Sequence, residues 1–180
     1  WETLSRSLNS NSTLKTLDLW VGKSLVESGH ILLTVTDNKT LKCLGLFGEA
    51  VAGESVGVVC EALRGLSALQ ALTLSVCDLS GDPVCLSVLA CFSQLKYLYV
   101  GDCRLGPVHM QTLTDVVPHL QWLDVSENTQ LGDEGTEALC VLMDNSSDLL
   151  WLSVEKCELS VECVKCVWTR ALHCHPLNLL

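Results

Sequence analysis

Leucines recur along the chain in short clusters whose spacing fits neither a single strand nor a single helix. The stretch LQALTLSVCDL places leucine at positions 69, 72, 74 and 79, with Cys77 between the last two. A half-buried strand alternates apolar and polar residues by two, whereas an amphipathic helix repeats its apolar positions by three or four. The mixed spacing therefore belongs to a unit larger than one regular element, and its recurrence shows what that unit is.

The same spacing returns in full further along the chain. LKYLYVGDCRL begins at Leu95 and LLWLSVEKCEL at Leu149, each with cysteine in the same place. LQWLDVSENTQL begins at Leu120 and has Asn128 there, with one extra residue before its last leucine. Internal periodicity of this kind is the sequence signature of a repeat array.

Shorter copies extend the array toward both ends of the chain. LKTLDLWVG from Leu14 and LKCLGLFGE from Leu41 keep the first half of the motif, and LNLL starts another copy at Leu177. The copies start at positions 14, 41, 69, 95, 120, 149 and 177, at intervals of 25 to 29 residues. We expect one array over residues 1–180, with partial units at both ends that expose apolar surface.

Segments between the strand motifs carry helix signals. In DEGTEALCVLMDN, residues 133–145, acidic side chains precede an apolar helical period. SGDPVCLSVLACF, residues 80–92, has a helix-start run that ends at Pro83. Residues 54–66 and 160–172 show similar patterns. Each unit is therefore predicted to be a short strand, a turn and a helix.

These motifs resemble the leucine-rich repeat family, whose pattern is L-x-x-L-x-L-x-x-N/C-x-L. The match covers nearly the whole chain, and the long repeat with a helix resembles the ribonuclease-inhibitor subtype, which also occurs in the C-terminal arrays of NOD-like (NACHT-LRR) receptors. The resemblance implies an α/β solenoid, a horseshoe with a concave parallel β-sheet and convex helices. It also implies that the leucines form a core shared by neighbouring repeats and that the Cys or Asn sits inside the turn.

Composition bears on the compartment. No apolar run reaches the length of a membrane span, because Glu61 and Arg64 interrupt the longest candidate, and no signal peptide is visible. The eleven cysteines follow the repeat rather than a disulfide framework, which favours free thiols in the cytoplasm. N-x-S/T sequons at Asn11, Asn38 and Asn145 leave glycosylation as the alternative to asparagine-rich turns before the strands.

The net charge of −10 bears on the partner. It argues against binding of nucleic acid, which needs a basic surface. It is compatible with a basic protein or peptide attracted over a distance, and also with acidity that serves solubility alone.

The resemblance places the third, fifth, seventh and eighth residues of each motif on the concave face. These positions hold six of the nine aromatic residues: Trp20, Phe47, Tyr97, Tyr99, Trp122 and Trp151. Tyr97, Trp122 and Trp151 fall in one column on successive strands and are predicted to form a ladder of rings. Four acidic residues flank it, with Lys156 as the accompanying base: Asp102, Asp124, Glu127 and Glu155.

Two interpretations of these rings remain open. Aromatic residues rimmed by charge are typical of protein-binding sites. Alternatively, large rings on a sheet cover the leucines from water and follow strand propensity. Trp20 and Phe47 would form a second, smaller patch.

Few residues point to chemistry. Cys163 and Cys166 form a C-x-x-C that could bind zinc with two of His173, Cys174 and His175, but helix packing explains the spacing equally well. Asp133, Glu134 and Glu137 are interpreted as charges at a helix start. The chain carries no phosphate-binding loop motif, and no catalytic arrangement, metal or cofactor is predicted.

The sequence therefore favours a non-enzymatic interaction module. The first hypothesis is the ligand-sensing array of a NOD-like innate immune receptor, and the second is a ribonuclease-inhibitor-like protein that binds a basic enzyme. A GTPase-activator-type regulator is the third, and it would have to use Arg104, the strand-adjacent arginine in a turn.

Overall fold

The protein folds as one parallel sheet with helices on one side of it. The computed structural model describes residues 2–20, 38–48, 59, 63–81, 83–173 and 178–179. In this part of the chain the sheet has seven strands in the order β1-β2-β3-β4-β5-β6-β7. Their bounds are β1 Thr16–Trp20, β2 Cys43–Phe47, β3 Ala71–Ser75, β4 Tyr97–Tyr99, β5 Trp122–Asp124, β6 Trp151–Ser153 and β7 Asn178–Leu179.

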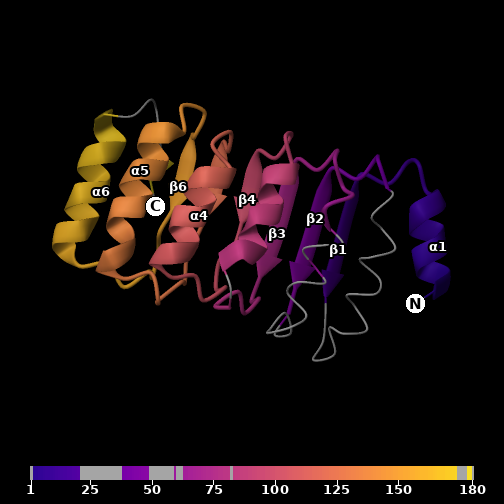
Figure 1. Ribbon diagram of the computed structural model, residues 1–180, viewed down its shortest axis with the longest axis horizontal. Helices are drawn as coiled ribbons and strands as arrows, with labels where there is room; N and C mark the ends of the chain where they lie inside the picture. Colours follow the sequence, from indigo (N-terminus) through magenta and orange to yellow (C-terminus); the bar gives the residue numbers. More distant parts are fainter. Residues whose placement is uncertain are drawn as a thin grey trace.

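From β3 onward, the described helices lie between successive strands and stand in a row on the same face of the sheet (Figure 1). Helix α1 lies at the N-terminal end of the row, and α6 at the opposite end. The described helices are α1 Glu2–Ser10, η1 Pro83–Cys91, α4 Pro107–Val116, η2 Asp133–Gly135, α5 Thr136–Asn145 and α6 Val161–His173. The predicted α/β solenoid is thus confirmed, with each strand neighbouring the next along the chain.

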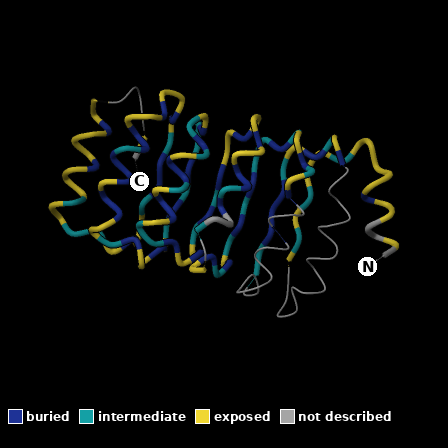
Figure 2. Tube along the Cα trace, viewed as in Figure 1, coloured by how far each residue is buried: buried dark blue, intermediate teal, exposed yellow. Residues whose placement is uncertain are grey.

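Strand register follows the leucine motif. Six strands begin two residues after the first leucine of their motif, so equivalent residues pair across the sheet. Leu98, Leu123 and Leu152 are partners in adjacent strands, and each is fully buried. They meet helix residues such as Leu113 and Leu139 in one continuous core, seen as dark blue stretches in Figure 2. Every repeat therefore completes its neighbour's core, which is how a solenoid is stabilised.

Buried thiols tie two of the described turns to the previous repeat, inside the turn as the motif predicts. The Cys103 thiol donates to the carbonyl of Leu74 at 2.9 Å, and Cys157 donates to the carbonyl of Val125 at 3.1 Å. Burial raises the pKa of Cys157 to about 11, so the thiol stays protonated at neutral pH and acts as a donor. A hydrogen bond with the neighbouring Cys77 side chain, together with burial, raises the pKa of Cys103 as well.

Asn128 satisfies more of the turn than a cysteine can. Its Nδ2 donates to the carbonyls of Val100 and Val125 at 2.9 and 2.7 Å. Its Oδ1 accepts from the N–H groups of Cys103 and Leu105 at 3.0 and 2.9 Å. The side chain is fully buried, so one amide supplies partners for backbone groups that water cannot reach.

Three helix predictions differ from the structure or fall outside it. Residues 83–91 form a 3-10 helix rather than an α-helix, since Leu86, Leu89 and Phe92 are buried at a spacing of three. Helix α4 agrees with the helix expected in each unit, but its segment was not singled out, because its residues are weak helix formers apart from Pro107 at its first turn. Of residues 54–66, most lie outside the described part of the chain.

Among the described residues, no helix has the length and apolar character needed to cross a lipid bilayer.

Candidate binding face

The sheet face away from the helices carries the predicted aromatic residues. Trp122 and Trp151 lie in register on β5 and β6, and their rings stack with centroids 4.1 Å apart and planes 19° from parallel. The Tyr99 ring on β4 lies beside that of Trp122, with centroids 6.5 Å apart and planes tilted by 40°. These three rings, Tyr99, Trp122 and Trp151, are called the aromatic cluster below. It spans three adjacent strands on a face that no described helix covers (Figure 1).

The predicted ladder is correct in backbone register but wrong in one ring. Tyr97 pairs with Trp122 along the strands, as expected. The tyrosine ring that contacts Trp122, however, is that of Tyr99, two residues further along β4. Tyr97 remains 38% exposed. Strand register fixes the position of the backbone and Cβ of each residue, whereas the side-chain rotamer determines where the ring lies.

Two polar groups of the cluster are perturbed by their surroundings. Burial raises the pKa of Tyr99, and the Asp124 carboxylate and Tyr97 add to the increase. The indole N–H of Trp122 is buried without a hydrogen-bond partner in the described structure. An unsatisfied buried donor costs about 1–3 kcal/mol, so an acceptor supplied by a bound molecule would remove that penalty.

Acidic residues line the end of the strands beside the cluster. The Asp124 carboxylate accepts a 2.9 Å hydrogen bond from the Ser126 N–H, which holds it in place. Glu127 pairs with Lys156 at 2.9 Å, and this contact raises the pKa of Lys156. Within the described chain, Asp102 and Glu155 are exposed without an ion-pair partner. The edge near β4–β6 therefore keeps unpaired negative charge.

The eighth motif position has a backbone conformation that the sequence did not reveal. Val76, Asp102, Glu127 and Lys156 all occupy it with φ between 51° and 61°, and Gly48 has φ 131°. This left-handed region is uncommon for non-glycine residues and least favourable for a β-branched one such as Val76. The repeated turn thus fixes where the charged side chains of this position leave the chain.

Charge is distributed unevenly between the two edges of the sheet. The second motif residue, just before each strand, is an exposed lysine in three repeats: Lys15, Lys42 and Lys96. The acidic residues described above follow the strands instead. Because all strands are parallel, they begin along one side of the sheet and end along the other. The side where the strands begin is basic near β1, β2 and β4. The side where they end, called the acidic edge below, is acidic near β4–β6.

A second aromatic pair lies nearer the N-terminus. Trp20 on β1 and Phe47 on β2 stack with centroids 4.9 Å apart and planes 20° from parallel. Trp20 is 82% exposed. Gly45 makes room for this pair, because a Cβ there would collide with the Phe47 ring and the Asp18 carboxylate. Between the pair and the aromatic cluster, β3 presents the smaller side chains of residues 71, 73 and 75.

Comparison with known proteins agrees with this architecture. A family profile described as Leucine Rich repeat matches residues 118–140. The chain folds as a leucine-rich repeat solenoid. The solenoid is similar to the TLR13 chain in the crystal structure of the TLR13–ssRNA13 complex, with a TM-score of 0.55 and 22% identity, over 83% of this chain and 19% of that one.

A protein from Bacteroides fragilis is also similar to the solenoid. Its crystal structure gives a TM-score of 0.59 at 16% identity, over 97% of this chain and 66% of the other. At such identities the likeness concerns the fold. The chain spans about a fifth of the TLR13 chain and just under two thirds of the bacterial protein. No curated protein matches the sequence.

Two further polar side chains of the solenoid, His109 and the sequon residue Asn38, are held by hydrogen bonds to the backbone. His109 accepts the Gly106 N–H through Nδ1 at 3.1 Å, so its Nε2 carries the proton toward the Gly81 carbonyl at 3.3 Å. Asn38 is buried, and its Nδ2 donates to the carbonyls of Leu8 and Asn11. A glycan cannot be attached to an amide that is held in this way.

The proposed zinc ligands and the arginine of the GTPase hypothesis can also be located. Cys163 and Cys166 lie on α6, while Cys174 and His175 fall outside the described residues. No group of three potential metal ligands occurs in the described part. The Arg104 guanidinium is held by the Asp78 carboxylate at 2.9 Å.

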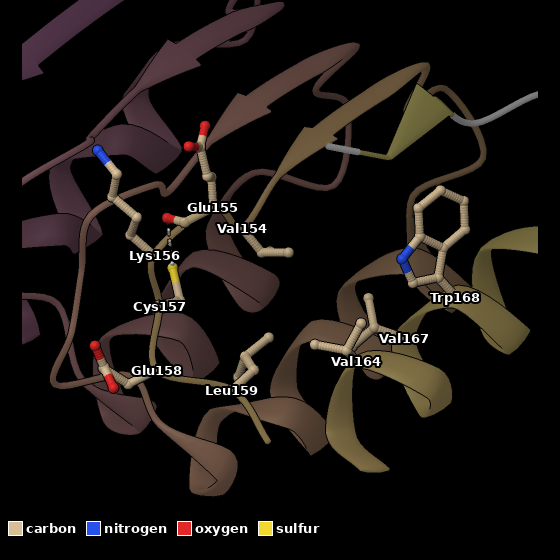
Figure 3. A pocket seen from close by; sticks show the side chains of 9 residues that line it. All are labelled: Val154, Glu155, Lys156, Cys157, Glu158, Leu159, Val164, Val167 and Trp168. Atoms are coloured by element: carbon tan, nitrogen blue, oxygen red, sulfur yellow. Dashed lines mark hydrogen bonds between the residues drawn. The ribbon is translucent and has the colours of Figure 1, made fainter. Parts of the chain in front are cut away.

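A hollow of about 380 Å³ lies at the last described turn, between that turn and α6 (Figure 3). Val154, Leu159 and Val164 face it, and Glu155, Lys156 and Glu158 lie around it. Val154 and Val125 occupy equivalent positions in successive repeats. The carbonyl of Val125 accepts a hydrogen bond from the Cys157 thiol.

Proposed function

We propose that the aromatic cluster and the acidic edge beside it form a protein-binding surface for a basic, extended segment. The observation that carries this proposal is the stacking of Trp122 on Trp151 next to unpaired carboxylates on the open face of the sheet. A leucine-rich repeat solenoid is consistent with protein–protein interaction.

The competing interpretation, that the rings cover the leucines, finds little support in the geometry. Leu98, Leu123 and Leu152 point to the helix side of the sheet and are fully buried there. The rings stand on the opposite side, so the strand backbone already separates them from the leucine core. Partly exposed aromatic rings on an otherwise polar face are the composition of an interface centre.

Arginine is the partner side chain that fits best. Its planar guanidinium stacks on indole faces, worth about 0.5–2 kcal/mol, and pairs with carboxylates in the same geometry. The Asp124 carboxylate, at the end of β5, acts on Tyr99, and Asp102 and Glu155 follow the neighbouring strands β4 and β6. The acidic edge would also attract a basic partner over about 8–10 Å before contact, an effect that salt weakens.

Peptide selection tests this proposal. Random peptides selected on the immobilised protein should be enriched in arginine and lysine, and calorimetry should give binding that weakens with added salt. Trp122→Ala and Trp151→Ala should each weaken binding by about tenfold or more, corresponding to hot-spot losses of roughly 1.5–2 kcal/mol. Trp168→Ala, on α6, is the matched control and should bind normally. Selection of acidic peptides, or equal loss with Trp168→Ala, would contradict the proposal.

We propose further that the array belongs to a cytoplasmic NOD-like innate immune receptor. The repeat of 25 to 29 residues with an α-helix and the free thiols of the described cysteines support this assignment. In such a receptor the open face would sense the ligand. Sequencing of the complete transcript tests the assignment, because a nucleotide-binding domain upstream is expected and a protein made only of repeats would exclude it.

A ribonuclease-inhibitor-like protein is the alternative, favoured by the net charge of −10 and the aromatic open face. It predicts tight, salt-sensitive inhibition of a basic ribonuclease, measured as loss of RNA cleavage. A GTPase-activator role would require faster GTP hydrolysis by a partner, lost on Arg104→Ala. Because Arg104 is paired with Asp78, we expect no such effect.

A further inference from the structure

Two cysteines on neighbouring helices approach each other on the side of the solenoid opposite the aromatic cluster. Cys140 lies on α5 and Cys166 on α6, and these helices pack side by side (Figure 1). Their sulfur atoms are 3.9 Å apart. Cys140 is buried, whereas Cys166 is exposed to solvent. The Cys166 thiol is thus accessible to a small oxidant, and the buried Cys140 thiol lies next to it.

An ion pair joins the same helices one turn further along. Arg170 follows Cys166 by four residues and Asp144 follows Cys140 by four, and their charged groups lie 3.4 Å apart. Burial raises the pKa of Cys140, the Cys166 thiol adds to the increase, and the Arg170 guanidinium opposes it. The pKa of Cys140 is raised on balance, and the guanidinium offsets part of the cost of removing the proton from this thiol.

We propose that Cys140 and Cys166 are a peroxide-oxidisable pair that closes into a disulfide between α5 and α6. The Cys166 thiolate attacks one oxygen of hydrogen peroxide, which breaks the O–O bond, gives a sulfenic acid and releases the other oxygen as water after protonation. The Cys140 thiolate then attacks the Cys166 sulfur and displaces its hydroxyl as a second water. Two thiols and one peroxide give one disulfide and two waters.

Other described cysteines lack this combination of exposure and proximity. Cys77 and Cys103 neighbour each other but are 1% and 0% exposed, so peroxide has no access to them. Cys91 is exposed, and its sulfur contacts the Arg64 guanidinium at 3.9 Å. Access and a second thiol within reach coincide at Cys140 and Cys166.

Closure requires a modest movement of α6. A disulfide bond is about 2.05 Å long, so the two sulfurs must approach by about 1.9 Å. Val161, Trp168 and Leu172 on α6 are 64%, 49% and 78% exposed, so the outer side of this helix is not held by other described elements. Rotation of the two side chains with a small shift of α6 toward α5 would bring the sulfurs into bonding distance.

Mass spectrometry of the full chain treated with hydrogen peroxide tests the proposal. The expected result is a single intramolecular cross-link between the peptides that contain Cys140 and Cys166, removed by dithiothreitol, with the thermal unfolding midpoint raised by several degrees. Cys140→Ser should leave Cys166 as a sulfenic acid that dimedone labels. Cys163→Ser, on the same helix, is the matched control and should retain the cross-link.

Two results would overturn the proposal. One is a dominant cross-link through another cysteine or between molecules, and the other is unchanged thiol loss in Cys166→Ser. Because Cys166 is exposed, its replacement leaves the core intact, so that variant remains informative even if Cys140→Ser folds poorly. The aromatic cluster takes no part in this chemistry, and peptide binding can therefore fail or succeed independently.

Discussion

The side-chain amide of Asn128 donates a 2.9 Å hydrogen bond to the carbonyl of Val100 in the preceding repeat. Four further hydrogen bonds join the same buried side chain to the backbone of Cys103, Leu105, Val125 and Ser126. Adjacent repeats are therefore connected through polar atoms as well as through leucines. Buried networks of this kind are costly to break, because the abandoned groups cannot turn to water.

Replacement of Asn128 should separate this network from simple packing. We expect Asn128→Leu to lower the free energy of unfolding by about 3 kcal/mol or more, since buried backbone groups lose their partners. Asn128→Cys should lose roughly half as much, because a thiol can still donate to the Val100 carbonyl as Cys157 does to Val125. Urea unfolding measures both. Equal stability of the two variants would contradict the assigned role.

Val76 predicts a stabilising substitution. It is a β-branched residue at φ 61° and 41% exposed, so little packing offsets the backbone strain. Val76→Gly and Val76→Asn should each raise the free energy of unfolding by about 0.5–1 kcal/mol, measured by urea denaturation. Val108, exposed in helix α4, provides the opposite control. Val108→Gly should destabilise the protein, and a gain there would show that glycine acts through some other route.

Asp78 should contribute to the acid sensitivity of the fold. A hydrogen bond from the Ser80 hydroxyl, helped by the Ser80 N–H and Arg104, holds its pKa below the usual value. A lowered folded-state pKa gives stability that is present above the unfolded pKa of about 3.9 and is lost as the pH falls through the folded value. Asp78→Asn should therefore flatten the decline of stability below about pH 4 in urea titrations. An unchanged loss of stability below about pH 4 would exclude Asp78 as a source of the acid sensitivity.

Lys156 tests the role of charge at the binding face. It neutralises Glu127 through a 2.9 Å ion pair at the acidic edge. Lys156→Ala should strengthen binding of an arginine-rich peptide by about twofold to fivefold at low salt, mainly through faster association. Lys96→Ala removes an exposed charge at the opposite edge and serves as the control. A larger gain in affinity with Lys96→Ala would contradict the proposal, because it would place the basic partner at the side where the strands begin. Stopped-flow fluorescence gives the rates.

The strand register could be predicted from sequence because leucine positions repeat with the period of the fold. Leu98, Leu123 and Leu152 each fall at the fourth residue of a motif, and the sheet brings them into line. The place of Cys103 and Asn128 inside the turns could be predicted for the same reason. Repeated environments impose repeated residue types, so the pattern is readable without an alignment.

Features that depend on backbone dihedral angles or side-chain rotamers could not be predicted from the sequence. The left-handed turn is occupied by Val76, Asp102, Glu127 and Lys156, which share no side-chain chemistry that would reveal it. The contact of Tyr99 rather than Tyr97 with Trp122 depends on side-chain rotation. The approach of Cys140 to Cys166 joins residues of two helices whose relative rotation no single repeat encodes.

The regular order of the strands has a consequence for any chain that binds across them. Adjacent strands lie about 4.8 Å apart, so β2, β4 and β6 succeed each other at intervals of about 9.6 Å. A peptide in the extended polyproline II conformation has three residues per turn and rises about 3.1 Å per residue, so every third side chain faces the same way, about 9.3 Å further along. Phe47, Tyr99 and Trp151 stand on these three strands. A peptide bound across the sheet would therefore have its anchoring side chains at every third position.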